Sequence, residues 1–473
     1  MGVAAAEALS GALTARVEEA LRRAAARRRP VLASATIELG AGADPAATVF
    51  ASRRADERWF AWEQPDRDSF ALGALGTAYA VDSAPAGDRF GAAARECSEL
   101  MRDAVIGEPP DRLAAGPVWV GGFAFFPDGG RDPQWASLPV TLLVLPEVSL
   151  ARNGDDTAAT ANVVCRPGDD ADALVQRAVV RVASLRHTEL PLADPDPAGG
   201  YEIASVLPPR QYERSVAEAA RRVRAREVDK VVLAREVRVG SGRPFNPGAV
   251  FDALRSGYPS CYCFCMGTPE AAFLGASPEL LVRRAGAVVS TVALAGSARR
   301  SADPAVDDHL GERLLHSPKD LDEHRIVVGT IERSLEPLSI WVAAADEPAV
   351  VKVANIQHLG TPVRAQLADP RSVVELAGAL HPTSAVGGEP WSAADPLVRT
   401  LEQLDRGWYA APVGWMDAAE DGELCVALRC ALLQGSTAHC YAGVGVVADS
   451  DPEAELAETE LKLQAIVPAL TGI

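Results

Sequence analysis

The chain of 473 residues contains almost no lysine. Only four of its 46 basic residues are lysine, namely Lys230, Lys319, Lys352 and Lys462. An arginine side chain stays protonated in proteins, whereas a lysine can give up its proton in a buried site. A chain so biased towards arginine is expected to keep lysine where a guanidinium group cannot do the chemistry. These four residues are therefore the first candidates for functional roles.

Acidic residues outnumber basic ones by 64 to 46, and long apolar runs are absent from the sequence. The formal net charge is −18, which argues against nucleic acid and anionic membrane surfaces as partners. No apolar run approaches the ~20 residues that a membrane-spanning helix needs. The stretch 1–29 combines an early glutamate with an arginine-rich end, which is typical of an amphipathic helix rather than of a signal peptide. We therefore expect a cytoplasmic protein that acts on a small molecule as a monomer.

The cysteines do not follow the spacing of a metal site. Cys261, Cys263 and Cys265 alternate in CYCFC, which places all three on one face of a strand. Zinc sites usually contain C-x2-C pairs, and no second cluster stands at that spacing. The cysteines are therefore expected to be small buried hydrophobic residues.

The order of predicted elements indicates an α+β fold with large antiparallel sheets. Strands are expected at 117–127, 230–239, 261–267, 271–277, 279–284, 288–297, 351–359, 409–417, 423–433 and 437–449, and a hairpin pair at 48–54 and 58–65. Helices are expected at 172–187, 209–227, 307–335 and 451–463. The polar, proline-rich segment 187–200 is the clearest linker. Length alone favours two or three domains.

The last predicted helix, DPEAELAETELKL, is strongly acidic. Its Asp-Pro start supplies an N-cap and a first-turn proline. Glu455 and Glu458 are three residues apart and share a face, and Lys462 lies four residues further on the same face. A solvated acidic surface is the usual explanation of such a run, and we expect it to hold for the other two glutamates of the helix.

Two more lysines have informative surroundings. In SPKDLDEHRIVV, Glu323 lies on a helix that the apolar residues after it make largely buried, so this carboxylate needs a partner. An i, i+4 pair with Lys319 is the simple alternative to a functional role. Lys230 opens an apolar strand, which is an unfavourable place for an ammonium group unless it is used. The simple alternative there is a lysine at a strand end that reaches solvent.

A succession of motifs resembles the chorismate-utilising enzymes, a family that includes isochorismate, salicylate, anthranilate and aminodeoxychorismate synthases. The motifs are DKVVLARE, FLGASPELLVRR, TVALAGS, SPKDLDEH, IQHLGTPV, LHPTSAVGG, DRGWYAAPVGW, VALRCALL, YAGVGVV and DPEAELAETELK. The resemblance is dense over 205–470, the implied catalytic part that binds chorismate, and looser over the N-terminal part at 1–195. It implies one fold over 1–473, in which two large, mostly antiparallel sheets pack together with helices outside.

The resemblance also implies chorismate as substrate, Mg2+ as cofactor and a role for individual residues. Lys230 matches the family's base for the attacking water, and Glu279 matches its general acid for the departing hydroxyl. Glu323 and Glu458 match its magnesium ligands, with Glu455 reaching the ion through water. The residues implied to bind the substrate are Gly296, Ser297, His358, Tyr409, Arg429, Gly443, Gly445 and Lys462.

Within the family, the residues favour an isochorismate synthase, in which water adds at C2 and the C4 hydroxyl leaves. Lys230 favours water over ammonia as nucleophile, because glutamine often fills this position in anthranilate synthases. Gly296 is followed by SARRS rather than by the GT-x-x-RG form of ammonia users. Salicylate synthases share the acid, the base and the metal ligands, but they tend to carry a hydroxyl residue at the position of Ala385.

Three alternatives stay open at this point: a salicylate synthase that also eliminates pyruvate, an ammonia-using synthase, and an inactive homologue that only binds a ligand. The presence of acid, base and metal carboxylates speaks against the inactive homologue. The sequence does not decide whether isochorismate would serve menaquinone or a catecholate siderophore.

Overall fold

The computed structural model describes residues 3–82, 87–192, 200–353 and 356–472. Half of the predicted linker 187–200, namely 193–199, and two residues of the predicted strand 351–359 lie outside the described residues. None of the described helices is long and apolar enough to cross a membrane.

The first of two large sheets has thirteen strands in the described part of the chain. Their order is β10 (Tyr201–Ser205), β11 (Lys230–Ser241), β23 (Thr437–Val446), β22 (Cys430–Gln434), β13 (Ala272–Ser277), β12 (Tyr262–Gly267), β2 (Trp59–Gln64), β3 (Phe70–Leu75), β8 (Val148–Asn153), β9 (Asp156–Cys165), β1 (Val31–Ala41) and β5 (Val105–Ile106), with β19 (Gly388–Glu389) paired to β11. All neighbours are antiparallel except β1 and β5.

The second sheet has ten described strands and is antiparallel throughout. Their order is β16 (Ser339–Ala344), β18 (Ile356–Leu367), β15 (Val288–Arg299), β14 (Leu280–Ala285), β21 (Gly422–Val426), β20 (Pro412–Asp417), β6 (Val118–Phe123), β7 (Thr141–Leu145) and β4 (Tyr79–Val81), with β17 (Ala349–Lys352) paired to β18. The predicted α+β class with large antiparallel sheets is confirmed.

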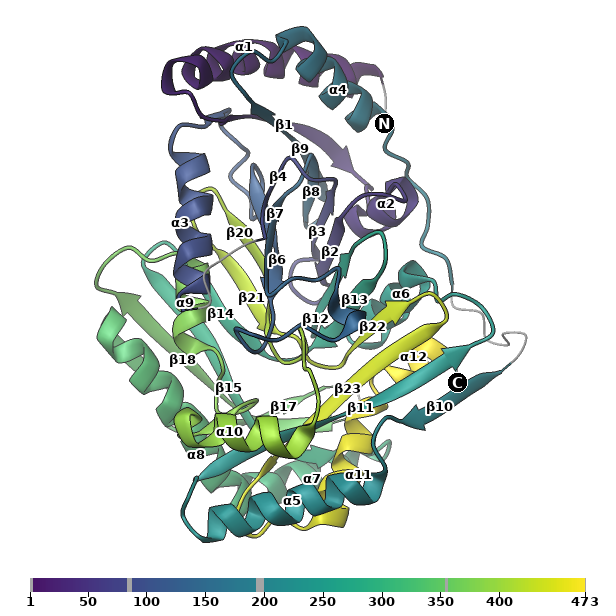
Figure 1. Cartoon of the computed structure of the whole chain (residues 1–473), viewed down its shortest axis with the longest axis vertical. Coiled ribbons are helices and arrows are strands. Elements are labelled where there is room, and N and C mark those ends of the chain that lie inside the picture. Colours follow the sequence, from purple (N-terminus) through teal and green to yellow (C-terminus); the bar gives the residue numbers. More distant parts are fainter. Residues whose placement is uncertain (1–2, 83–86, 193–199, 354–355, 473) are drawn as a thin grey trace.

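Helices surround the two sheets (Figure 1). Helices α1 and α4 lie together over the β1–β9 end, and α5, α7, α8, α10 and α11 gather at the opposite end of the molecule. The helices are α1 (Val3–Arg27), α2 (Pro45–Ser52), α3 (Arg89–Arg102), α4 (Ala171–Ala183), α5 (Pro209–Arg224), α6 (Pro247–Gly257), α7 (Pro304–Leu315), α8 (Pro318–Leu335), α9 (Val373–Leu380), α10 (Trp391–Glu402), α11 (Pro452–Leu463) and α12 (Val467–Thr471).

In both sheets, a strand of the N-terminal part, 1–195, pairs with a strand of the part 205–470. Strand β2 pairs with β12 in the first sheet, and β6 pairs with β20 in the second. This pairing is what a single fold over 1–473 requires, although the predicted division into an N-terminal and a catalytic part stays a prediction.

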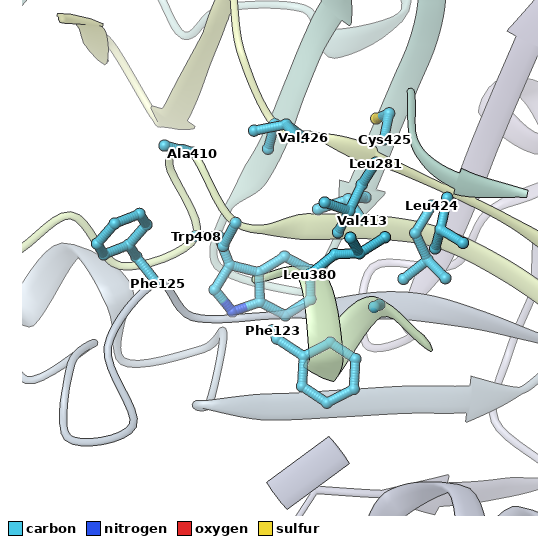
Figure 2. Close-up of a cluster of buried hydrophobic side chains, with 14 of the residues drawn as sticks. Phe123, Phe125, Leu281, Leu380, Trp408, Ala410, Val413, Leu424, Cys425 and Val426 are labelled. Carbon is cyan, nitrogen blue, oxygen red and sulfur yellow. The ribbon is translucent and has the colours of Figure 1, made fainter. Parts of the chain in front are cut away.

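A hydrophobic core lies between the sheets. It combines Phe60 and Phe70 of the first sheet with Trp119 and Val413 of the second. Figure 2 shows part of it, with Trp408 lying among apolar side chains from several elements. All eight cysteines are buried and free, as expected for small hydrophobic residues.

The predicted hairpin between 48–54 and 58–65 is wrong, because Thr48–Ser52 belong to helix α2. The side chain of Asp44 accepts a hydrogen bond from the Ala47 N–H at 3.0 Å, and Pro45 occupies the first turn. This N-cap and proline signature stands in the sequence as ADPAAT, and it outweighs the β-propensity of Thr48 and Val49. Strand β2 pairs instead with β3 and β12.

The predicted strand at 423–433 is also wrong, because it forms two strands in different sheets. Strand β21 ends at Val426 in the ten-stranded sheet, and β22 begins at Cys430 in the thirteen-stranded sheet. Arg429 makes the turn with a φ of +49°, a left-handed conformation that is uncommon outside glycine. The crossing brings Arg429 to the place where the two sheets meet.

A buried ion pair joins the end of α10 to strand β11. Arg406 is 0% exposed, and its Nε donates to Glu402 Oε2 at 2.9 Å. The guanidinium also donates to the carbonyls of Val386 at 2.8 Å and Val232 at 3.0 Å. Glu402 accepts a further hydrogen bond from the Ala234 N–H at 2.7 Å. The pair thus ties β11 to the segment that follows α9.

We expect Arg406→Met to destabilise the fold strongly, because it leaves the Glu402 carboxylate buried without its partner. Breaking a buried pair in this way costs about 3–5 kcal/mol of unfolding free energy. Equilibrium urea unfolding measures the loss. The matched control is Arg22→Met, which removes an exposed pair with Glu19 and should leave the midpoint within experimental error. An equal loss in both variants would contradict the structural role of Arg406.

Candidate active site

A pocket lies where β11, β23, β15 and β18 approach helices α8 and α11. All thirteen site residues predicted from the sequence line it: Lys230, Glu279, Gly296, Ser297, Glu323, His358, Tyr409, Arg429, Gly443, Gly445, Glu455, Glu458 and Lys462. Ala385 lines it as well. The free volume is about 100 Å³, below the ~300–1,000 Å³ of typical ligand pockets. Binding a ring-sized substrate therefore requires side chains to move.

Two glycines of β23 make room for the charged side chains. A Cβ at position 445 would lie 2.6 Å from Lys230 Cε and 2.7 Å from Glu323 Oε1. A Cβ at position 443 would lie 2.9 Å from the Tyr409 hydroxyl. Real Cβ atoms do not approach other heavy atoms so closely, so Gly443 and Gly445 are needed for this packing.

Ion pairs between lysine and glutamate dominate the pocket wall. They are Lys230 with Glu323 at 2.9 Å, Lys319 with Glu455 at 3.5 Å, and Lys462 with Glu458 at 2.8 Å. Three of the four lysines in the chain thus lie in one pocket. The fourth, Lys352, lies elsewhere and pairs with Asp307 and Asp308.

The simple alternatives for two of these residues are wrong. Lys230 does not reach solvent: it is 1% exposed at the start of β11. The Glu323 carboxylate is paired with Lys230 rather than with Lys319, one turn before it on α8. Helix α8 begins with Ser317, whose side chain accepts the Asp320 N–H, and this cap sets the face on which Glu323 lies.

Helix α11 presents its carboxylates as the sequence predicts. The Asp451 side chain caps the helix by accepting the Ala454 N–H at 2.9 Å. Burial alone would raise the pKa of Glu458, but Lys462 and the Ser297 hydroxyl outweigh it and hold this pKa at about 2. Ser297 Oγ donates to Glu458 Oε1 at 2.8 Å. Glu458 is therefore a permanent anion in the pocket.

The two outer glutamates of α11 differ from one another. Glu453 is exposed, as expected. Glu460 is exposed too, but its carboxylate accepts hydrogen bonds from both terminal nitrogens of Arg235, at 2.8 and 2.6 Å. The expectation that Glu460 is merely solvated is wrong, because Arg235 projects from β11 towards the helix.

The carboxylates that face one another across the pocket are crowded. The pKa of Glu455 is raised by its burial and by the neighbouring charge of Glu458. Asp320 also lines the pocket, and its pKa is raised by burial and by Glu323 and Glu458. Asp320 and Lys319 were missed as site residues, although Asp320 precedes Glu323 by three residues on α8 and so shares its face.

Glu279 differs from Glu323, Glu455 and Glu458 because no lysine or arginine of the described residues forms an ion pair with it. It lies between β13 and β14 and is 7% exposed. Burial raises its pKa to about 7, although Lys230, Arg429 and Lys462 act in the opposite direction. The Ser277 hydroxyl accepts its backbone N–H at 3.2 Å, and its carbonyl accepts the Val426 N–H at 3.0 Å. A carboxyl group held in this way is protonated in part at neutral pH.

Arg429 gives the pocket a second, cationic side, and His358 lies next to it. His358 Nδ1 lies 3.1 Å from the Gly296 carbonyl, which can only accept, so Nδ1 carries the proton. Burial and the nearby Arg429 lower the pKa of His358 to about 3. The imidazole is therefore neutral, and its Nε2 accepts from Arg429 NH2 at 3.4 Å. This contact orients the guanidinium towards the pocket.

The carboxylates have the chemistry that a magnesium ion requires, since Mg2+ prefers oxygen ligands that include one or two carboxylates. Glu323, Glu455 and Glu458 all line the same pocket, and Asp320 lies beside them. Among the described residues, however, no three such groups are arranged around one point. Each glutamate is turned towards a lysine, so an ion has to displace these lysines. The donor set fits the metal, and the role of Mg2+ stays a prediction.

Comparisons of the sequence with known proteins all point to chorismate-binding enzymes. A family model described as chorismate binding enzyme matches residues 19–471. The salicylate biosynthesis isochorismate synthase of Pseudomonas aeruginosa is 38% identical over 98% of this chain and 95% of its own length. The isochorismate synthase MenF of Bacillus subtilis is 35% identical over 76% of each chain.

Solved structures resemble the fold over most of its length. The menaquinone-specific isochorismate synthase MenF of Escherichia coli is 26% identical with a TM-score of 0.79, covering 97% of this chain and all of the other. Anthranilate synthase component I of Streptococcus pneumoniae, at 19% identity and a TM-score of 0.64, covers 84% of this chain and 92% of its own, and it shows the fold alone. The chain belongs to the chorismate-binding enzyme family.

Proposed function

We propose that the protein is an isochorismate synthase, an isomerase that converts chorismate to isochorismate. Water adds at C2 of the ring and the C4 hydroxyl leaves. One observation carries the proposal. The pocket holds a buried lysine, Lys230, and a buried carboxyl group, that of Glu279, which forms no ion pair among the described residues and whose pKa is raised to about 7. Such a pair supplies the base for the water and the acid for the departing hydroxyl. The names of the curated relatives support the same reaction.

In the proposed reaction, Lys230 takes up one proton and Glu279 gives up another. The amine form of Lys230 takes a proton from the attacking water. Glu279, protonated in part near pH 7, gives its proton to the C4 oxygen as the bond to the ring breaks. The burial of both groups keeps bulk water from competing as acid or base.

Chorismate is a dicarboxylate, and the proposed clamp for it consists of Arg429, Lys462 and the backbone of Gly443 and Gly445. Lys462 is anchored by donating to the Gly443 carbonyl at 2.9 Å, which fixes its ammonium beside the glycines. The absence of a Cβ at both glycines allows a carboxylate to approach the backbone N–H groups. His358, being neutral, adds no charge and serves to hold Arg429.

We propose that Mg2+ binds through Glu323 and Glu458, with Glu455 reaching it through water. When bound, the ion would supply positive charge that offsets the ring carboxylate of the substrate. Glu323 and Glu458 would hold it as oxygen ligands, and Lys230 and Lys462, which these glutamates pair with, would then be free to face the substrate. In a chain with net charge −18, local cations such as Lys462 and Arg429 are what an anionic substrate requires.

A salicylate synthase is the second candidate, because it shares these groups and because one relative acts in salicylate biosynthesis. That relative is itself named an isochorismate synthase. Ala385 lines the pocket where salicylate synthases tend to carry a hydroxyl, which favours isochorismate as the released product. Resolving the products formed from chorismate and Mg2+ separates the two. We further propose that the protein works in the cytoplasm as a monomer.

Lys230→Ala and Lys230→Arg should both abolish turnover of chorismate while the fold persists. Arginine keeps the positive charge but does not accept a proton near neutral pH, so charge alone should not rescue the reaction. Chromatographic assay of isochorismate measures turnover, and circular dichroism reports the fold. Lys352→Arg, which changes a lysine outside the pocket, is the matched control and should be fully active. Turnover near the unaltered rate in Lys230→Arg would sink the base assignment.

Glu279→Gln should bind chorismate but lose turnover by about 10²–10⁴, the usual contribution of general acid catalysis. In the unaltered protein, the forward rate requires protonated Glu279 and should fall as pH rises through about 7. The reverse reaction, from isochorismate, uses the same two groups in exchanged roles, and because the isomerisation releases no proton its kcat/KM should fall over the same range. Rates measured in both directions across pH test this in the unaltered protein and in Glu279→Gln. A fall near pH 7 that persists in the glutamine variant, or an active glutamine variant, would mean that the acid lies elsewhere.

Activity should vanish in excess chelator and return with Mg2+. Substitution of groups that merely support metal ligands lowers affinity about 10–100-fold, so Glu323→Gln and Glu458→Gln should raise the Mg2+ concentration needed for half-maximal activity at least tenfold. Glu453→Gln, on the exposed side of α11, is the control and should change nothing. Full activity at a metal content measured as nil would refute the role of the ion.

A further inference from the structure

A second cleft, of about 480 Å³, lies on the other side of the segment that follows α9 and shares no lining residue with the active-site pocket. We call it the Arg89 cleft. It is formed where the start of α3, the residues after β6, helix α9 and the start of α10 meet. The lining residues that matter below are Arg89, Phe90, Phe125, His381 and Trp391.

Arg89 is a buried cation without an anionic partner. It is 6% exposed, and burial lowers its pKa to about 10. Its terminal nitrogens donate to the carbonyls of Phe126 and Phe125, both at 3.1 Å, and no carboxylate pairs with it among the described residues. A buried charge without a counter-ion is unfavourable, and an anionic ligand would neutralise it.

The acids at the cleft are already engaged. Asp88 accepts the Gly91 N–H at 3.1 Å and pairs with Arg95 at 3.0 Å. Glu375 belongs to the capping box of α9 and pairs with Arg371 at 3.2 Å. The charges of these four side chains cancel. Asp128 attracts Arg89 without forming an ion pair with it, but that carboxylate is bound by Arg399 at 3.0 Å, so the guanidinium of Arg89 is the surplus charge of the cleft.

Aromatic rings form the walls beside this charge. Arg89 lies over the ring of Phe90, with Cζ 4.9 Å from its centroid. Phe125 and Trp391 meet edge to face at 5.8 Å, and His381 lies 5.2 Å from Phe125 and 5.9 Å from Phe90. Flat apolar surfaces next to one cation match a planar ring that carries one acidic group.

His381 adds a polar contact of defined direction. Its Nε2 lies 2.9 Å from the Phe125 carbonyl, so the proton is on Nε2. Burial lowers the pKa of His381 to about 3, which makes the imidazole neutral and leaves Nδ1 as an acceptor. A hydroxyl group on the ligand can donate to this nitrogen.

We propose that the Arg89 cleft binds a small hydroxylated aromatic carboxylate and that its occupant acts on the active site. The cleft volume is within the ~300–1,000 Å³ of ligand pockets. His381 and Pro382 line the cleft, whereas Ala385 and Val386, a few residues further, line the active-site pocket. A ligand therefore contacts one side of a segment whose other side faces chorismate. The effect on turnover rests on the proposed function, but binding does not.

Isothermal titration calorimetry with 2-hydroxybenzoate tests the site, with benzoate and acetate as probes of the hydroxyl and of the ring. We expect affinity to fall from 2-hydroxybenzoate to benzoate to acetate. Arg89→Met should weaken 2-hydroxybenzoate binding at least tenfold. Ala379→Phe, which fills the cleft from its exposed rim and leaves Arg89 in place, should do the same. Arg102→Met, which removes an exposed arginine at the end of α3 outside the cleft lining, should bind normally.

Two further measurements keep the result decisive. Chorismate at saturating concentration should change the affinity for the probe by a limited factor rather than compete with it, because the cleft and the pocket are distinct but coupled. Saturating 2-hydroxybenzoate should change kcat or KM for chorismate at least twofold in the unaltered protein and in Arg102→Met, but not in Ala379→Phe. Equal binding in all variants, full competition by chorismate, or no binding at millimolar concentration would overturn the proposal. An inactive protein that still binds the probe through Arg89 would sink the proposed function and leave the site standing.

Discussion

The active-site pocket depends on how charge is balanced where little water enters. Two of its glutamates illustrate this. Glu458 is paired with Lys462 and has a pKa of about 2, whereas Glu279 has no basic partner and a pKa of about 7. The same residue type thus becomes a permanent anion at one position and an acid at another, because only the first has a cation in contact. Such a separation of the pKa values of two carboxyl groups supports the different roles that we propose for them.

The fold serves this balance by bringing backbone and charge unusually close together. Gly443 and Gly445 allow β23 to pass directly beside Lys230 and Glu323, and the left-handed turn at Arg429 passes the chain from one sheet to the other at the rim of the pocket. The buried pair of Arg406 with Glu402 fixes β11 through hydrogen bonds to the backbone of Val232 and Ala234. These supports hold the charged groups of the pocket in fixed positions, on which catalysis by orientation depends.

The sequence predicted what depends on local spacing and missed what depends on tertiary contacts. The face of α11 that carries Glu455 and Glu458 follows from helical periodicity, and the thirteen residues taken from the family motifs do meet in one pocket. Sequence spacing could not tell that Glu323 pairs with Lys230, since an i, i+4 pair competes with a partner from a distant strand. Nor could it show the break at Arg429, because a left-handed conformation at a residue other than glycine leaves no clear mark.

The choice between the two basic side chains now has a physical pattern. Three of the four lysines, Lys230, Lys319 and Lys462, line the pocket for which we propose proton transfer and exchange of partners, whereas Lys352 pairs with two aspartates elsewhere. For Arg429 in the pocket and Arg89 in the second cleft we propose only that a fixed positive charge holds an anion, which a guanidinium group does without exchanging protons. A planar guanidinium between aromatic rings and carbonyls is fixed in direction, which suits binding alone. The two clefts on either side of one segment therefore differ in their basic residues, in keeping with the reaction proposed for one and the binding proposed for the other.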